Sequence, residues 1–217
     1  MRHIQFTLFA DGSTDRALLP LLHWLVRETH GPDTVAHEFF SRPQFHADLS
    51  FTERLQTALD LAPCDILFVH RDAENQASQL RYNEIAEAVA SLNIRFATIP
   101  HVCVVPVRMT EAWLLADESA IRQAAGRPKS IEPLDLPKLS RIDTNPDPKK
   151  TLYELLREAS GKKGRRRASF DVREAAALVP EFMDSFAPLR QLDAFARLEA
   201  DLSKLRFCDT ATTARNM

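Results

Sequence analysis

Short apolar runs alternate with amphipathic segments through the first half of the chain. Runs rich in Ile, Val and Phe predict strands at residues 3–9, 35–41, 66–69 and 101–107. Apolar residues at helical spacing predict helices at residues 15–29, 51–61 and 76–92. Because strands and helices alternate, we expect an α/β fold with a mostly parallel, Rossmann-like sheet flanked by helices.

The pattern changes after residue 110. Helical spacing then dominates, and it predicts helices at residues 111–125, 149–159, 172–183 and 186–205. A Pro-rich stretch with little periodicity, residues 127–148, follows the first of them. We therefore expect an α/β core, residues 1–126, and a mainly helical C-terminal extension, residues 127–217, packed on that core.

Acidic residues follow two of the predicted strands. Asp11 comes directly after the first strand, and Asp72 and Glu74 follow the third. The carboxyl ends of neighbouring parallel strands share one edge of a sheet, where ligands bind. Residues two apart in extended backbone point to the same side, so Asp72 and Glu74 can face one ion. We expect Asp11, Asp72 and Glu74 to hold Mg²⁺ or Mn²⁺, since hard cations prefer carboxylate oxygens; the alternative is a plain turn with solvated acids.

Other polar residues flank these acids. Glu111 starts a predicted helix beside the same edge, as a further metal ligand or as an acid that favours the helix N-terminus. Gly12 and Asp15 belong to the first turn, where Asp15 is expected to orient the backbone. His70 is expected to act as an acid–base group or as a hydrogen-bonded structural residue. Arg71 is expected to hold a phosphate, or to pair with Asp15 or Glu74.

These turns resemble known motifs. The strand ending in Asp11-Gly12-Ser13-Thr14-Asp15 resembles the first motif of TOPRIM domains, a strand ending in Glu-Gly-x-x-Asp. The run Ile-Leu-Phe-Val-His-Arg-Asp-Ala-Glu, residues 66–74, resembles their second motif, a hydrophobic strand ending in Asp-x-Asp. The chain as a whole is similar to the TOPRIM-related family of unknown function numbered 4276. That family adds a Glu-x-Trp-Leu-Leu-Ala-Asp segment, here residues 111–117, and a Pro-Lys-Lys helix start, here residues 148–150.

The resemblance implies a TOPRIM-like core and Mg²⁺-dependent nuclease activity on DNA or RNA. It places Asp11, Asp72 and Glu74 in the catalytic role, with Asp11 as the acid or base. It also implies a place in bacterial defence loci, phage defence included, or in repair loci, beside an ATPase partner. Two departures matter: Asp11 stands where the motif has Glu, and Glu74 stands at the second Asp of Asp-x-Asp. The alternative is a non-catalytic regulatory subunit of an ATPase with a degraded site. A third alternative is a nucleotide-binding module, although GxxxxGK[ST] and GxGxxG are absent from the sequence.

A basic segment lies in the extension. Its six positions carry five cations, Lys162, Lys163, Arg165, Arg166 and Arg167. We expect them to bind the nucleic-acid phosphate backbone without sequence specificity, or to form a solvated mobile loop. Lys149 and Lys150 are expected to add phosphate contacts near the metal edge. The formal net charge of −2 argues against nucleic-acid binding by bulk charge, but not against binding by a local patch.

Composition favours a cytoplasmic globular protein. The chain is 45% hydrophobic and 27% charged, as soluble domains usually are. Cys64, Cys103 and Cys208 form no CxxC pattern, which suits a reducing compartment. We expect no membrane segment, since no apolar run approaches ~18 residues, and no signal peptide; an oligomer is left open.

Overall fold

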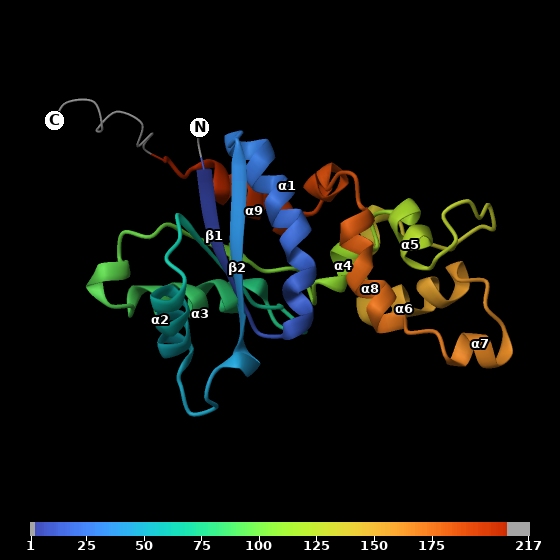
Figure 1. The fold of residues 1–217 in the computed structure, drawn as a ribbon, viewed down its shortest axis with the longest axis horizontal. Helices are drawn as coiled ribbons and strands as arrows, with labels where there is room; N and C mark the ends of the chain where they lie inside the picture. The colour runs from blue at the N-terminus through green and yellow to red at the C-terminus, as the bar shows by residue number, and fades with distance from the viewer. Residues whose placement is uncertain (1–2, 208–217) are drawn as a thin grey trace.

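Four parallel strands form one sheet in the computed structural model, which describes residues 3–207. The strands are β1 (His3–Ala10), β2 (Thr34–Ser41), β3 (Ile66–His70) and β4 (His101–Val104), in the order β2-β1-β3-β4. The predicted α/β, Rossmann-like fold with a parallel sheet is confirmed (Figure 1). β4 is an edge strand and ends before Pro106, which has no N–H to continue the ladder.

Helices cover both faces of the sheet. They are α1 (Leu19–His30), α2 (Phe51–Leu61), α3 (Ser78–Ala90) and α9 (Asp193–Ser203). Phe6 and Phe68 belong to the hydrophobic cluster that includes α1 and α9. Phe9, Leu67 and Val69 belong to a second cluster with α2 and α3. Apolar residues therefore follow one another without alternation in β3, because both of its faces are buried.

The register of the strands brings two polar turns together. Phe9 of β1 lies opposite Val69 of β3, and His70 lies opposite Val104 of β4. All strands run in the same direction, so the segments after Ala10 and after His70 leave the sheet at one edge. The candidate site is built from those two segments.

The first helix begins differently from the prediction. A 3-10 turn, η1 (Ser13–Leu18), precedes α1, and Gly12 holds its N-cap position. Pro20 lies in the first turn of α1 and has no N–H, so it cannot donate to the carbonyl four residues earlier. The tighter turn before Pro20 carries Asp15, whose ionisable side chain is buried.

The remaining helices form a layer beside the sheet. They are α4 (Glu111–Leu114), α5 (Glu118–Ala124), α6 (Pro148–Ala159), α7 (Gly164–Ala168) and α8 (Val172–Leu178). Further 3-10 turns are η2 (Arg42–Gln44), η3 (Ile94–Phe96), η4 (Leu139–Thr144), η5 (Val179–Phe182) and η6 (Ala187–Gln191). The helices predicted at 111–125, 172–183 and 186–205 are thus each interrupted. Pro180 and Pro188 stand in the first turns of η5 and η6, where their missing N–H is tolerated.

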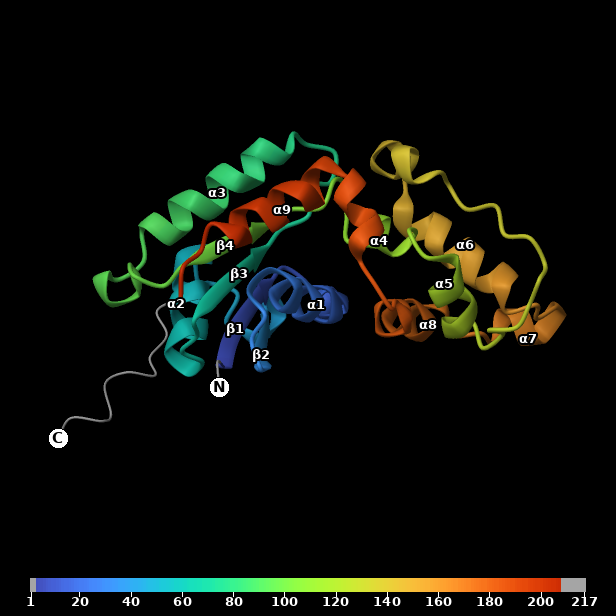
Figure 2. The same ribbon diagram turned by 90° about the horizontal axis from the view of Figure 1, so that it is seen from above.

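The last helix returns to the sheet. α9 contacts α1 and β4, so the chain crosses from the helical layer back to the α/β core (Figure 2). Phe195 is fully buried, and its ring meets Trp113 of α4 at 5.7 Å between centroids. One continuous hydrophobic cluster spans both parts. The boundary expected at residue 126 stays a prediction, and Cys208 with the rest of residues 208–217 lies outside the described part.

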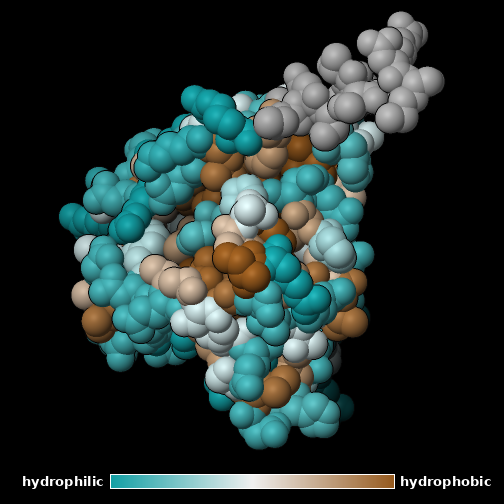
Figure 3. Space-filling model, turned by 90° about the vertical axis from the view of Figure 1, so that its left-hand side faces the viewer, coloured by the Kyte–Doolittle hydropathy of each residue, from teal (hydrophilic) through white to brown (hydrophobic). Residues whose placement is uncertain are grey.

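The surface at the α2 and α3 end is mostly hydrophilic, with a hydrophobic patch near the middle of the face in Figure 3. Leu61 and Ile94 are large apolar residues that remain exposed on α2 and η3. Self-association stays untested. Among residues 3–207, no helix has both the length and the apolar character that a membrane span requires.

Candidate metal centre

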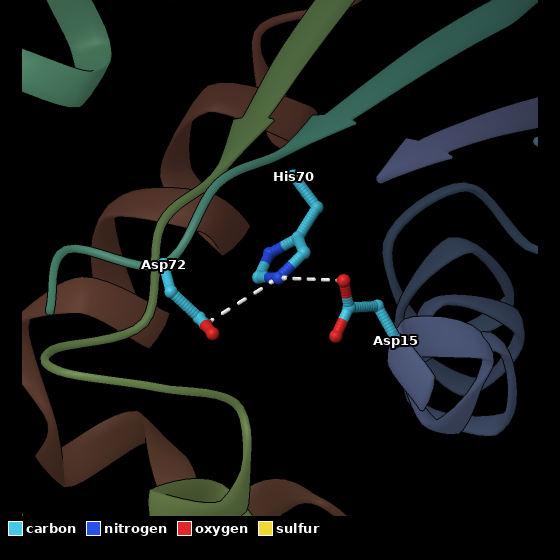
Figure 4. Close-up of side chains that lie close together, drawn as sticks. All are labelled: Asp15, His70 and Asp72. Atoms are coloured by element: carbon cyan, nitrogen blue, oxygen red, sulfur yellow. Dashed lines mark ion pairs between the residues drawn. The ribbon is translucent and has the colours of Figure 1, made fainter. Parts of the chain in front are cut away.

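Three side chains converge where β1 and β3 end. Asp15 comes from η1, His70 is the last residue of β3, and Asp72 lies two residues further on. One ligand atom from each lies within 4.8 Å of the others. His70 Nε2 lies 3.6 Å from Asp15 Oδ2 and 3.4 Å from Asp72 Oδ1, with the imidazole between the two carboxylates (Figure 4).

A backbone carbonyl fixes the orientation of His70. Nδ1 lies 2.9 Å from the carbonyl oxygen of Val104, and the imidazole is completely buried. A carbonyl only accepts hydrogen bonds, so Nδ1 carries the hydrogen and donates it. Nε2 is then left facing both acids. A histidine that binds a metal usually donates its other N–H to such a carbonyl.

The distances in the group, 3.4 and 3.6 Å, are close to those between ligands of one ion. Good hydrogen bonds from nitrogen to oxygen measure about 2.9 Å, and the separations of 3.4 and 3.6 Å exceed that value. Nitrogen and oxygen ligands at about 2.1 Å from one cation lie roughly 3.0–3.4 Å apart. The alternative is an imidazolium that neutralises both acids without a metal.

Backbone groups hold the two acids in place. Asp15 Oδ2 accepts the N–H of Gly12 at 2.8 Å. Asp72 Oδ1 accepts the N–H of Thr110 at 3.0 Å, and Arg81 Nε donates to the backbone oxygen of Asp72 at 3.0 Å. The ligand atoms are therefore positioned before any ion arrives.

Both carboxyl groups hold their charge at a cost. The pKa of Asp72 is raised to about 6, chiefly by burial; His70 lowers it in part, and the neighbouring Asp15 and Glu111 add to the rise. Burial likewise raises the pKa of Asp15, with Glu111 and Asp11 adding to the effect. A bound cation would relieve this repulsion.

Glu111 lies beside the group without joining it. Its Oε1 accepts from Lys149 Nζ at 2.8 Å, and this hydrogen bond raises the pKa of Lys149. Glu111 is still close enough to raise the pKa of both Asp15 and Asp72. Lys149 therefore fixes the side chain of Glu111, and the negative charge of Glu111 raises the pKa values of the two acids.

The structure does not gather the acids that the sequence predicted. Arg71 Nε donates to Asp11 Oδ2 at 2.9 Å, and Arg71 Nη1 donates to Glu84 Oε2 at 2.9 Å. Among residues 3–207, Asp11 and Glu74 therefore join no group of metal-ligating side chains, and Asp72 combines with Asp15 and His70 instead. Arg71 pairs with Asp11, whereas Asp15 or Glu74 was the expected partner.

The expected position of Glu74 depended on an extended backbone. Glu74 has a φ of 53°, in the left-handed region, so the alternation assumed for Asp72 and Glu74 does not apply. Its side chain is 67% exposed and lies 3.6 Å from Arg81 Nη2. The correction follows from a turn that residue spacing does not reveal.

Asp15 and His70 were expected only as supporting residues. Two features of the sequence could have identified Asp15 and His70 as candidate metal ligands. Asp15 stands three residues after Gly12, the spacing at which an acid returns to the N-cap N–H. His70 ends a fully buried strand at the edge where ligands bind.

The basic residues occupy a separate place. α7 is a short helix where a pliable loop was expected, and a hollow beside it is lined by Ser160, Gly161, Lys162, Lys163, Arg165 and Arg166. Within residues 3–207, no carboxylate pairs with the five cations of residues 162–167. Lys150 lies 4.0 Å from Glu154. The uncompensated charge sits in the helical layer.

Comparison with known proteins gives no relative: no family model, no curated protein and no solved structure matches the chain. Membership of the TOPRIM-related family therefore stays a prediction.

Proposed function

We propose that the protein is a metal-dependent phosphodiester hydrolase, a nuclease in which Asp15, His70 and Asp72 bind the catalytic cation. The observation that carries the proposal is the fixed orientation of His70, whose Nε2 faces two carboxylates at 3.4 and 3.6 Å. A divalent cation bound there would polarise a phosphodiester oxygen and lower the pKa of a bound water.

The donor set favours Mn²⁺ over Mg²⁺. Mg²⁺ prefers oxygen ligands and keeps several waters, whereas imidazole suits transition metals. Two carboxylates and one imidazole form a mixed set that Mn²⁺ accepts, and Zn²⁺ accepts it as well. Mn²⁺ was expected alongside Mg²⁺, and the imidazole of His70 in the group supports the choice of Mn²⁺ in this proposal.

One cation beside the centre and a separate basic hollow support a phosphate-containing substrate. Lys149 reaches the centre through Glu111, and the hollow beside α7 carries positive charge that no acid of residues 3–207 offsets. Contacts of this kind hold a phosphate backbone without reading its sequence. A role in bacterial defence or repair, beside an ATPase, belongs to the same proposal.

The test combines metal binding with cleavage. Calorimetry should show one Mn²⁺ per chain, and Asp15→Asn and Asp72→Asn should each weaken binding at least about tenfold. Plasmid and single-stranded DNA and RNA should be cut by the wild type with Mn²⁺ and not by these variants. Glu74→Gln is the matched comparison, because Glu74 lies outside the group and its loss should leave Mn²⁺ binding intact.

Two outcomes count against the proposal. Equal cleavage by the wild type and by Asp72→Asn would identify a contaminating nuclease. Loss of Mn²⁺ binding in Glu74→Gln together with normal binding in Asp15→Asn would return the site to the acids expected from the sequence.

A second candidate is a regulatory subunit of an ATPase. The observation in its favour is the ion pair between Asp11 and Arg71, because Asp11 then cannot serve as the free acid or base of an intact TOPRIM motif. In that case Mn²⁺ binds to Asp15, His70 and Asp72 while no nucleic acid is cut.

A further inference from the structure

A cavity opens beside the candidate metal centre. Asp15 lines it, and so does Thr110, whose N–H donates to Asp72 and whose hydroxyl lies 3.4 Å from His70 Nε2. Any group in this cavity is therefore a neighbour of a group bound at the centre.

Small and apolar residues keep the cavity open. Its walls come from η1, α4, α6 and α8, and the lining includes Ala17, Leu114, Tyr153, Ala176 and Ala177. Three of these five residues are alanines, so a larger side chain at one of them would fill the space. The mainly apolar lining suits a weakly polar group that can lie against the ring of Tyr153.

A cation also lines the cavity. Arg173 belongs to α8, is exposed, and has no carboxylate partner within the described chain. Glu111 also lines the cavity and pairs with Lys149 at 2.8 Å. A ligand that matches all these features has a flat ring at one end and a phosphate at the other.

We propose that this cavity, hereafter the ring slot, binds the nucleoside next to the phosphate that the metal centre holds. The inference rests on the proposed function and adds to it a substrate class, the nucleotide, with its base against Tyr153 and its phosphate between the metal centre and Arg173. Stacking on an aromatic ring tolerates every base, so the ring slot selects for a nucleoside and not for a sequence.

The first experiment compares four probes on the full chain in the presence of Mn²⁺. Adenosine monophosphate should bind about tenfold more tightly than ribose phosphate or inorganic phosphate, because only the first carries an aromatic base that can stack on Tyr153. The dinucleotide ApA is the fourth probe and separates two sources of the same chemistry. Binding of ApA tighter than that of adenosine monophosphate indicates a polynucleotide, and the reverse indicates a free nucleotide.

Two variants localise the effect. Ala177 is exposed on α8, so Ala177→Leu fills the ring slot from the surface and leaves the core alone. It should abolish the tenfold preference while Mn²⁺ binding is unchanged. Ala196→Leu is the control, because Ala196 is an exposed alanine on α9 that does not line the ring slot. Tyr153→Leu should also reduce the preference, by removing the ring.

The outcomes separate the two proposals. Normal Mn²⁺ binding without a preference for adenosine monophosphate overturns the ring slot and leaves the hydrolase standing. A preference that survives in Ala177→Leu also overturns it, since the nucleoside then binds elsewhere. Absence of Mn²⁺ binding in the wild type overturns the hydrolase, and the ring slot with it, because the phosphate then has no anchor.

Discussion

Asp72 occupies a position where its charge is costly to the folded state. Burial raises its pKa from 3.8 to about 6, so the folded protein binds this proton more tightly than the unfolded chain does. The contribution of the protonated Asp72 carboxyl to the free energy of unfolding is complete below about pH 4 and is lost as the pH rises through 6. An amide at this position would avoid that loss while keeping the oxygen that accepts from Thr110.

We therefore expect Asp72→Asn to stabilise the metal-free protein. At pH 8 the free energy of unfolding should rise by about 1–3 kcal/mol, and the difference should shrink towards zero near pH 4. Urea denaturation at the two pH values, with a chelator present, measures both. Added Mn²⁺ should then stabilise the wild type and not the variant. If Asp72→Asn were less stable than the wild type at pH 8, the charge of Asp72 would not destabilise the folded protein.

The metal group shows what residue spacing can and cannot predict. The edge of the sheet was predictable, because parallel strands end together and polar residues follow β1 and β3. The choice among those residues was not, because it depends on single backbone angles. Glu74 turns away at a φ of 53°, and the pairing of Asp11 with Arg71 joins segments 60 residues apart.

Among the elements, strands were easier to predict than the ends of helices. β3 is buried on both faces, so its continuous apolar run predicts a strand. Residues 111–125 show apolar residues at helical spacing because both halves contribute to one hydrophobic cluster, with Trp113 in α4 and Ile121 in α5. The break between them depends on Asp117, which is extended and accepts the N–H of Ala120 at 3.0 Å. The spacing of apolar residues predicts which side of a helix is buried, but it does not predict where an N-cap such as Asp117 begins a new helix.

This cap can be tested directly. Asp117→Ala removes the acceptor for the first turn of α5 and should destabilise the protein by about 1 kcal/mol. Asp117→Ser keeps an acceptor and should recover most of that loss. Urea denaturation at neutral pH measures both variants. If alanine were as stable as aspartate, the break would have another cause and α4 and α5 could join into the predicted helix.

On the scale of the whole molecule, α9 ties the helical layer to the sheet. The chain leaves the α/β core after β4, builds α4 to α8, and then places α9 against α1 and β4. Phe195 is 0% exposed and contacts Trp113, which belongs to the helical layer. Because one hydrophobic cluster contains residues of both parts, neither can lose its packing alone. The candidate centre depends on this closure, since Asp15 lies in the core and Glu111 starts the helical layer.

We expect the protein to unfold in a single transition, because the buried side chain of Phe195 packs the two parts together. Phe195→Ala should cost about 3–5 kcal/mol through the cavity it leaves, and should lower the melting temperature of the whole transition by roughly 10 °C. Phe182→Ala is the matched control, because Phe182 is 36% exposed on η5 and its loss should cost far less. Calorimetry and circular dichroism, which report packing and helix content, should give coincident curves. If Phe195→Ala instead split the curve into two transitions, the α/β core would keep its structure without α9, and the core and the helical layer would be separate folding units.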